Sequence, residues 1–298
     1  VMLGMQLVYS CKLFAELAQR TGQAEDGAWC VRVASELTEV LNSDLVWDGR
    51  WYRRLLLSNG KTLGSATNAQ GQIYLNPQSW SVISGVGDLD GRGRTAMAAV
   101  AERLDSDCGL QILTPPFTGI PEPEDPRLGS NPGIGENGGI FCHANTWAVI
   151  AECLLGNGDR AFKYFRQLLP EVVSERFGRQ HYQREPYVFV SSIIGPGSDR
   201  FGEGGISWLT GTASWMYVAA TQYLLGLRPT YDGLVVRPCL PAALEHVTVD
   251  RCFRGKTHHI ELCRKGRPEP VLEIDGQALG DALIPLDCPD GATIRCRG

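Results

Sequence analysis

Apolar residues recur at helical spacing through most of the sequence, and this periodicity limits the chain to folds built from paired helices. Residues 2–20 and 26–45 each place apolar side chains three or four positions apart, with a short polar connection between them. This spacing predicts two antiparallel helices, an αα-hairpin. A second hairpin is expected over 140–155 and 160–169, where glycines end the first helix and Pro170 ends the second.

The pattern changes at Pro229, after which short β-rich runs alternate with turns. These runs span residues 231–239, 247–253, 258–263 and 271–274. We therefore predict a mainly α chain in which residues 1–228 carry the substrate cleft and residues 229–298 form a small antiparallel β region. Recurring helical hairpins with long loops between them favour an α/α toroid, whose loops line a central cleft at one rim.

Composition and charge exclude several classes of function. Of the 298 residues, 43% are hydrophobic and 20% are charged, which is enough to build a sizeable core. The net charge is −5 and no basic run is present, so neither nucleic acid nor an anionic membrane is an expected partner. No apolar stretch approaches the roughly 18 residues that a membrane-spanning helix needs.

The cysteines and acidic clusters do not predict a metal site. The ten cysteines are scattered and contain no C-x-x-C pair, so we expect free core residues in a reduced, cytoplasmic protein. The segment Asp88-Leu-Asp90-Gly91 suggests a calcium loop, but a calcium-binding EF-hand places its glycine sixth. Here the glycine is fourth, which is typical of a turn.

The stretch from Pro132 to Trp147 is the first candidate site. A glycine-rich loop enters a helix and carries one carboxylate, Glu136, and one imidazole, His143, which could line one pocket. The run from Gly133 to Gly138 also matches G-x-G-x-x-G. That pattern indicates a dinucleotide site only after a buried strand, and an extended loop precedes it here.

A second glycine-rich loop leads to Thr210 and Gly211, which are expected to begin another helix. Helix starts present unpaired N–H groups, so Thr210, Gly211 and His143 together suggest a phosphate cradle. Two simpler interpretations stay open. Thr210 could be a helix cap, or a buried threonine whose hydroxyl donates to a backbone carbonyl of its own helix. His143 could be a core histidine whose nitrogens already have hydrogen-bond partners.

Five motifs in one order resemble the cellobiose phosphorylase family, glycoside hydrolase family 94. This family also holds chitobiose and cellodextrin phosphorylases and the phosphorylase-like domain of cyclic β-glucan synthases. The motifs are Glu136-Asn-Gly-Gly-Ile-Phe-Cys-His143, Gly156-Asn-Gly-Asp-Arg-Ala161, Glu185-Pro-Tyr-Val188, Trp208-Leu-Thr-Gly-Thr-Ala213 and Leu227-Arg-Pro-Thr-Tyr-Asp-Gly-Leu234.

The resemblance implies that residues 1–228 are the C-terminal portion of an (α/α)6 barrel, followed by the β region. It implies inverting phosphorolysis, in which phosphate attacks a β-glycoside and yields an α-sugar 1-phosphate. On the matching positions, His143, Thr210 and Gly211 would bind phosphate, and Glu136 would bind the donor sugar. The implied partners are a β-glucoside oligosaccharide and phosphate, with no cofactor, and the full-length protein would be a homodimer.

Two departures from the family pattern matter. The family's general acid is an aspartate in an Asp-Trp-Asn-Asp motif, which this sequence does not contain. The start at Val1 reads like the middle of a helix, so we expect a fragment whose general acid lies upstream and which is inactive alone. Ser191 or Ser192, and Ser130, stand where cellobiose-specific members carry glutamine and tyrosine. Ser191 is therefore a candidate sugar contact, and cellobiose is not assigned.

Two other functions compete with phosphorolysis. One is an α/α-barrel glycoside hydrolase in which water replaces phosphate. The other is a non-catalytic glycan-binding module, which agrees with the missing acid.

Overall fold

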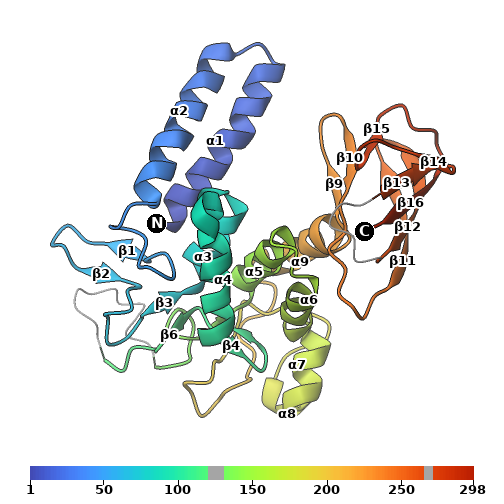
Figure 1. The fold of residues 1–298 in the computed structure, drawn as a ribbon. Helices are drawn as coiled ribbons and strands as arrows, with labels where there is room; N and C mark the ends of the chain where they lie inside the picture. The colour runs from blue at the N-terminus through green and yellow to red at the C-terminus, as the bar shows by residue number, and fades with distance from the viewer. Residues whose placement is uncertain (120–130, 265–270) are drawn as a thin grey trace.

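A computed structural model describes residues 1–119, 131–264 and 271–298. The predicted position Ser130 and much of the long loop expected after Pro116 lie outside these residues. The chain begins with the predicted hairpin, α1 (Met2–Arg20) and α2 (Ala24–Leu41), which projects from the body as an arm (Figure 1). Met5, Val8 and Cys11 of α1 are buried at helical spacing, as the periodicity requires.

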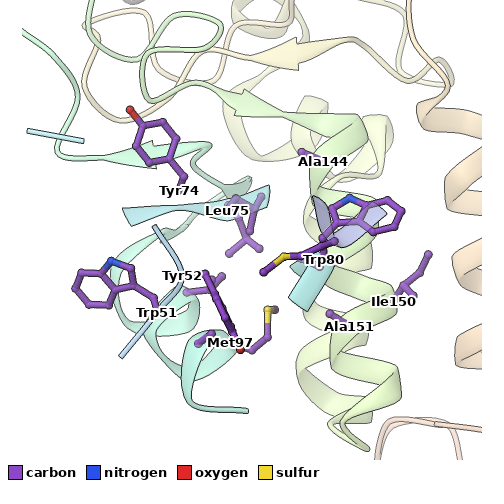
Figure 2. Close-up of a cluster of buried hydrophobic side chains, with 14 of the residues drawn as sticks. Trp51, Tyr52, Tyr74, Leu75, Trp80, Met97, Ala144, Ile150 and Ala151 are labelled. Atoms are coloured by element: carbon purple, nitrogen blue, oxygen red, sulfur yellow. The ribbon is translucent and has the colours of Figure 1, made fainter. Parts of the chain in front are cut away.

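Helix α5 (Cys142–Leu154) lies at the centre of the helical part and packs against α3, α6, α9 and the π-helix η3. Ten of its thirteen residues are buried, so other parts of the chain cover it on nearly all sides. Figure 2 shows Trp80 of α3 lying against the α5 backbone between Ala144 and Ile150. The other helices are α3 (Leu75–Ile83), η1 (Val86–Gly91), α4 (Arg92–Arg103), α6 (Gly158–Gln167), α7 (Pro170–Phe177), α8 (Arg179–Tyr182), α9 (Thr212–Val218) and η3 (Ala219–Leu224).

The loops between these helices contain strand pairs of two residues each. All four pairs are antiparallel, and β7 with β8 joins the two glycine-rich loops next to α5. The strands are β1 (Leu55–Leu56) with β2 (Thr62–Leu63), β3 (Ile73–Tyr74) with β6 (Leu113–Thr114), β4 (Asp105–Ser106) with β5 (Gly109–Leu110), and β7 (Ile140–Phe141) with β8 (Ser192–Ile193).

The C-terminal region forms two sheets, with strand orders β15-β10-β9 and β11-β12-β16-β13-β14 (Figure 1). Its first strand begins at Leu227, slightly before the predicted change at Pro229. The strands are β9 (Leu227–Pro229), β10 (Gly233–Val236), β11 (His246–Phe253), β12 (Lys256–Cys263), β13 (Val271–Ile274), β14 (Gln277–Ala278), β15 (Leu283–Pro285) and β16 (Thr293–Arg297).

The C-terminal β region was predicted to be antiparallel, and this prediction is wrong for one pair of strands. Strand β16 runs parallel to β12 and antiparallel to β13, because it inserts between them after the β13–β14 hairpin. Ile260, Leu262 and Ile294 are buried across this junction. The extra strand therefore completes the core of the sheet.

The structure also bears on the cysteine, metal and membrane predictions. All ten cysteines are free and most are buried. Residues 86–91 form the short helix η1, and no cluster of potential metal ligands is found among the described residues. No helix in the described part of the chain combines the length and apolar character needed to span a membrane.

Gly226, which joins η3 to β9, offers a test of this packing. It has φ +70°, and a Cβ there would lie 2.0 Å from the carbonyl oxygen of Arg237. Gly156 has a similar φ of +76°, but nothing lies within 4 Å of its Cβ position. We expect Gly156→Ala to lower the free energy of unfolding by about 1 kcal/mol through backbone strain. Gly226→Ala should cost at least about 3 kcal/mol because the steric clash adds to that strain.

Urea unfolding of both variants measures the difference. Equal losses of stability in the two variants would show that the approach of Gly226 to Arg237 is not close in solution.

Candidate active site

His143 is the second residue of α5, in its first turn, as the sequence predicted. Strand β7 runs directly into this helix, and Phe141 precedes it with an extended backbone and no capping side chain. The backbone oxygen of His143 accepts a hydrogen bond from Thr146 Oγ1 at 2.6 Å. The imidazole is therefore mounted on the most buried helix of the chain, which fixes its position.

Thr210 and Gly211 lie just before α9 and not within it. The helix begins at Thr212, and Gly211 is its N-cap residue, without a side-chain cap. The Thr210 hydroxyl instead lies 2.7 Å from the Thr212 hydroxyl, so the interpretation of Thr210 as a helix cap is wrong. Helix α9 has seven residues before the π-helix, so its dipole adds little to anion binding.

The structure brings His143 and Gly211 into contact, although 68 residues separate them in the sequence. A Cβ atom added to Gly211 would lie 3.4 Å from Cε1 of His143 and 3.6 Å from Cδ1 of Trp215. The φ of Gly211 is −73°, which any residue can adopt. Glycine therefore matters here for space, since it leaves room beside the imidazole that a side chain would occupy.

The imidazole lies among indole rings, and its Nε2 has no hydrogen-bond partner in the part of the chain that the structure describes. Its ring centre is 4.9 Å from that of Trp147 and 6.1 Å from that of Trp215. Nε2 of His143 is buried, and among the described residues nothing bonds to it. Buried nitrogens in proteins are nearly always bonded. The described chain therefore does not supply the partner that a core histidine would have.

Burial lowers the pKa of His143 below its ordinary 6.5, because leaving water disfavours the charged imidazolium. The imidazole is therefore neutral at pH 7. An anion beside Nε2 would oppose this shift, since a neighbouring negative charge favours the protonated ring.

Ser191 is brought to the start of the same helix by backbone pairing. Its carbonyl accepts the N–H of Cys142 at 3.0 Å, and its own N–H donates to Ile206 at 2.8 Å. Its side chain is 7% exposed, and its Oγ would lie 3.2 Å from a Cβ on Gly205. The two glycine-rich loops thus meet at Ser191, directly next to His143.

Glu136 is half-buried in a tight turn closed by a bridge between Ile134 and Asn137. The Asn137 amide holds this turn, since Oδ1 accepts from the N–H of Phe117 at 2.7 Å and Nδ2 donates to its carbonyl at 2.8 Å. No contact among the described residues joins the Glu136 carboxylate to His143 or Thr210. The structure therefore places Gly211 against the His143 ring and the Ser191 backbone against that of Cys142, and it leaves Glu136 on the approaching loop.

Sequence reasoning did not find Asn145 or the indoles of Trp147 and Trp215. Asn145 is fully buried, and its amide bonds both the N–H and the carbonyl of Leu110, at 2.7 and 2.9 Å. A polar residue inside the apolar run from Ala144 to Ile150 was the available signal. Its role depends on a partner 35 residues away.

The sequence model of the glycosyl hydrolase 94 superfamily catalytic domain matches residues 1–226, which include every residue of this site. The chain belongs to this superfamily. It is 35% identical over 280 residues to a solabiose phosphorylase of Paenibacillus borealis, covering 93% of this chain and 36% of that protein. It is 36% identical over 255 residues to an N,N'-diacetylchitobiose phosphorylase of Vibrio proteolyticus. That match covers 84% of this chain and 31% of that protein. The chain thus spans about a third of the length of these relatives.

Among solved structures, a sialidase shares the fold with a TM-score of 0.56 at 12% identity. The match covers 86% of this chain and 23% of that one. At this identity the likeness concerns the fold alone. The family resemblance seen in the sequence motifs is confirmed by the superfamily match and the phosphorylase relatives.

The environment of His143 predicts its titration. We expect its NMR signals to titrate below pH 6.5, with His143→Gln identifying them by their loss. Because the folded-state pKa is below the unfolded one, the unfolded chain binds more protons in this window. Stability should therefore fall as the pH drops below 6.5, and less so in His143→Gln. Titration of His143 at or above 6.5 would show that the ring is not desolvated.

Proposed function

We propose that this chain provides the phosphate and sugar contacts of an inverting glycoside phosphorylase. The reaction transfers the glycosyl group of a β-linked glucoside to inorganic phosphate and releases an α-sugar 1-phosphate. The observation that supports this proposal best is the buried Nε2 of His143, which has no partner among the described residues, in a ring whose Cε1 lies against Gly211. The phosphorylase activities printed for the relatives supply the class of reaction.

In this proposal, phosphate binds beside His143 and the Gly211 backbone. A neutral imidazole that carries its proton on Nε2 donates a hydrogen bond to a phosphate oxygen. The two hydroxyls of Thr210 and Thr212 bond to each other, so one proton of the pair remains for a second oxygen. Phosphate is already an anionic nucleophile, so the site needs no general base and acts by orientation and charge stabilisation.

Glu136 and Ser191 are proposed to contact the donor sugar next to this phosphate. We assign no general acid within the chain. The aspartate that the family resemblance implies belongs to an Asp-Trp-Asn-Asp motif, which the sequence does not contain. The proposal therefore includes that the chain by itself does not cleave glycosides.

We extend the proposal to the whole protein. Its helical part belongs to an (α/α)6 barrel, and the protein acts as a cytoplasmic homodimer. The hairpin α1–α2 and the central position of α5 support the barrel. The free, largely buried cysteines support a reducing compartment.

Kinetics of the full-length protein test the proposal. We expect no cleavage without phosphate, and His143→Gln should raise the KM for phosphate about tenfold or more, since one charge-assisted hydrogen bond is lost. Thr210→Val should also raise the KM for phosphate. Thr221→Val is the matched control, because its hydroxyl bonds only the carbonyl of Tyr217 within the helix.

Two results would contradict the proposal. Cleavage at full rate without phosphate would indicate a hydrolase. Oligosaccharide binding that is unaffected by phosphate, in a protein without any cleavage activity, would indicate a glycan-binding module.

A further inference from the structure

Two cysteines, Cys153 and Cys239, lie in contact although they are 86 residues apart in the sequence. Cys153 is the next-to-last residue of α5, and Cys239 follows β10 in the C-terminal region. Cys239 packs against the helical core that includes Cys153, and the two thiols share a hydrogen bond. The pair therefore lies where the helical part meets the C-terminal region (Figure 1).

Main-chain contacts hold both cysteines in place. The N–H of Cys239 donates to the carbonyl of Leu224, at the end of η3, with a distance of 2.9 Å. A Cβ added to Gly158 would lie 2.9 Å from the carbonyl oxygen of Cys239, so a residue without a side chain allows this close approach. The carbonyl of Cys153 accepts the N–H of Gly156 at 3.0 Å in the turn after α5. The contact between the two thiols thus rests on a fixed backbone.

The two thiols differ in exposure and in acidity. Cys153 is 9% exposed, whereas Cys239 is partly exposed, and both line a cavity of about 680 Å³ that a small molecule can enter. The hydrogen bond from the Cys153 thiol lowers the pKa of Cys239, and burial together with Glu152 and Asp159 opposes this shift without reversing it. The same hydrogen bond, together with burial, raises the pKa of Cys153. Cys239 is therefore the thiol that ionises first.

We propose that Cys239 and Cys153 form a redox-sensitive dithiol, which hydrogen peroxide oxidises to a disulfide. A sensing cysteine needs access to the oxidant, a thiolate and a second thiol within reach, and this pair combines the three. Disulfides that form in a reducing compartment are usually transient and serve catalysis or sensing. This disulfide ties the end of α5 to the C-terminal region.

The reaction takes two steps and uses the peroxide as its oxidant. The Cys239 thiolate attacks one peroxide oxygen, which breaks the O–O bond and gives a sulfenic acid. Hydroxide leaves and takes up the proton that Cys239 lost, which forms the first water. The Cys153 sulfur then attacks the Cys239 sulfur, and the Cys153 proton leaves with the sulfenic hydroxyl as the second water. Two thiols are oxidised to one disulfide, and one hydrogen peroxide is reduced to two waters.

The experiment treats the reduced chain with hydrogen peroxide, blocks the remaining thiols with iodoacetamide and maps the peptides by mass spectrometry. We expect a linked Cys153–Cys239 peptide that dithiothreitol removes. Cys239 should be oxidised roughly fivefold faster than Cys252, an exposed cysteine of β11, because the hydrogen bond from Cys153 favours its thiolate. Absence of the linked peptide would overturn the proposal, as would linkage of Cys239 mainly to Cys263, which lines the same cavity.

Single variants separate the roles of the two cysteines. In Cys153→Ser the resolving thiol is gone, so the sulfenic acid of Cys239 should form more slowly but persist, and dimedone should trap it. In Cys239→Ser the buried Cys153 should resist peroxide. This second variant changes a partly exposed position, so it tests the proposal even if Cys153→Ser does not fold.

Cys263→Ser is the matched control, because it removes another thiol of the same cavity and leaves the pair intact. It should form the linked Cys153–Cys239 peptide at the rate of the parent chain. Loss of the linked peptide in this control would contradict the assignment of the pair. Oxidation of Cys153 at the parent rate in Cys239→Ser would contradict the role of Cys239 as the thiol that reacts first.

Discussion

Buried side-chain amides determine where the loops of this protein lie. Asn145 bonds both backbone groups of Leu110, and Asn137 does the same to Phe117. In the adjoining core, Gln78 bonds the N–H and the carbonyl of Tyr52, each at 2.8 Å. Each amide thereby satisfies both backbone groups of a buried residue. Breaking one would leave buried donors and acceptors unpaired, at a cost of about 1–3 kcal/mol per group.

The candidate site depends on this arrangement because its residues come from loops and helix starts. Asn145 lies two positions after His143, so the amide that holds Leu110 also fixes the first turn of α5. The neighbouring β7–β8 pair then brings Ser191 to the same point. The first turn that carries the imidazole is thus fixed, while its Nε2 has no partner among the described residues, an arrangement that is costly unless a ligand completes it.

Local patterns in the sequence predicted the helices well, because burial of one helix face imposes a period that can be read directly. Short β-rich runs also predicted β10, β11, β12 and β13, but not β9, β14, β15 or β16. The parallel pairing of β16 with β12 is a long-range property with no local signature. His143 was placed correctly in its helix, whereas Thr210 and Gly211 were expected to begin a helix and lie just before α9, which starts at Thr212. The contact between His143 and Gly211 could be suspected from the family motifs, but only the packing of α9 on α5 shows it.

We propose above that an oxyanion binds between His143 and Gly211. A crystal structure of the chain soaked with tungstate, an electron-dense analogue of phosphate, tests it most directly. We expect an anomalous tungsten peak beside the Gly211 backbone, with a tungstate oxygen about 3 Å from Nε2 of His143. Tungstate bound only at other places, with Nε2 of His143 still unpartnered, would contradict it.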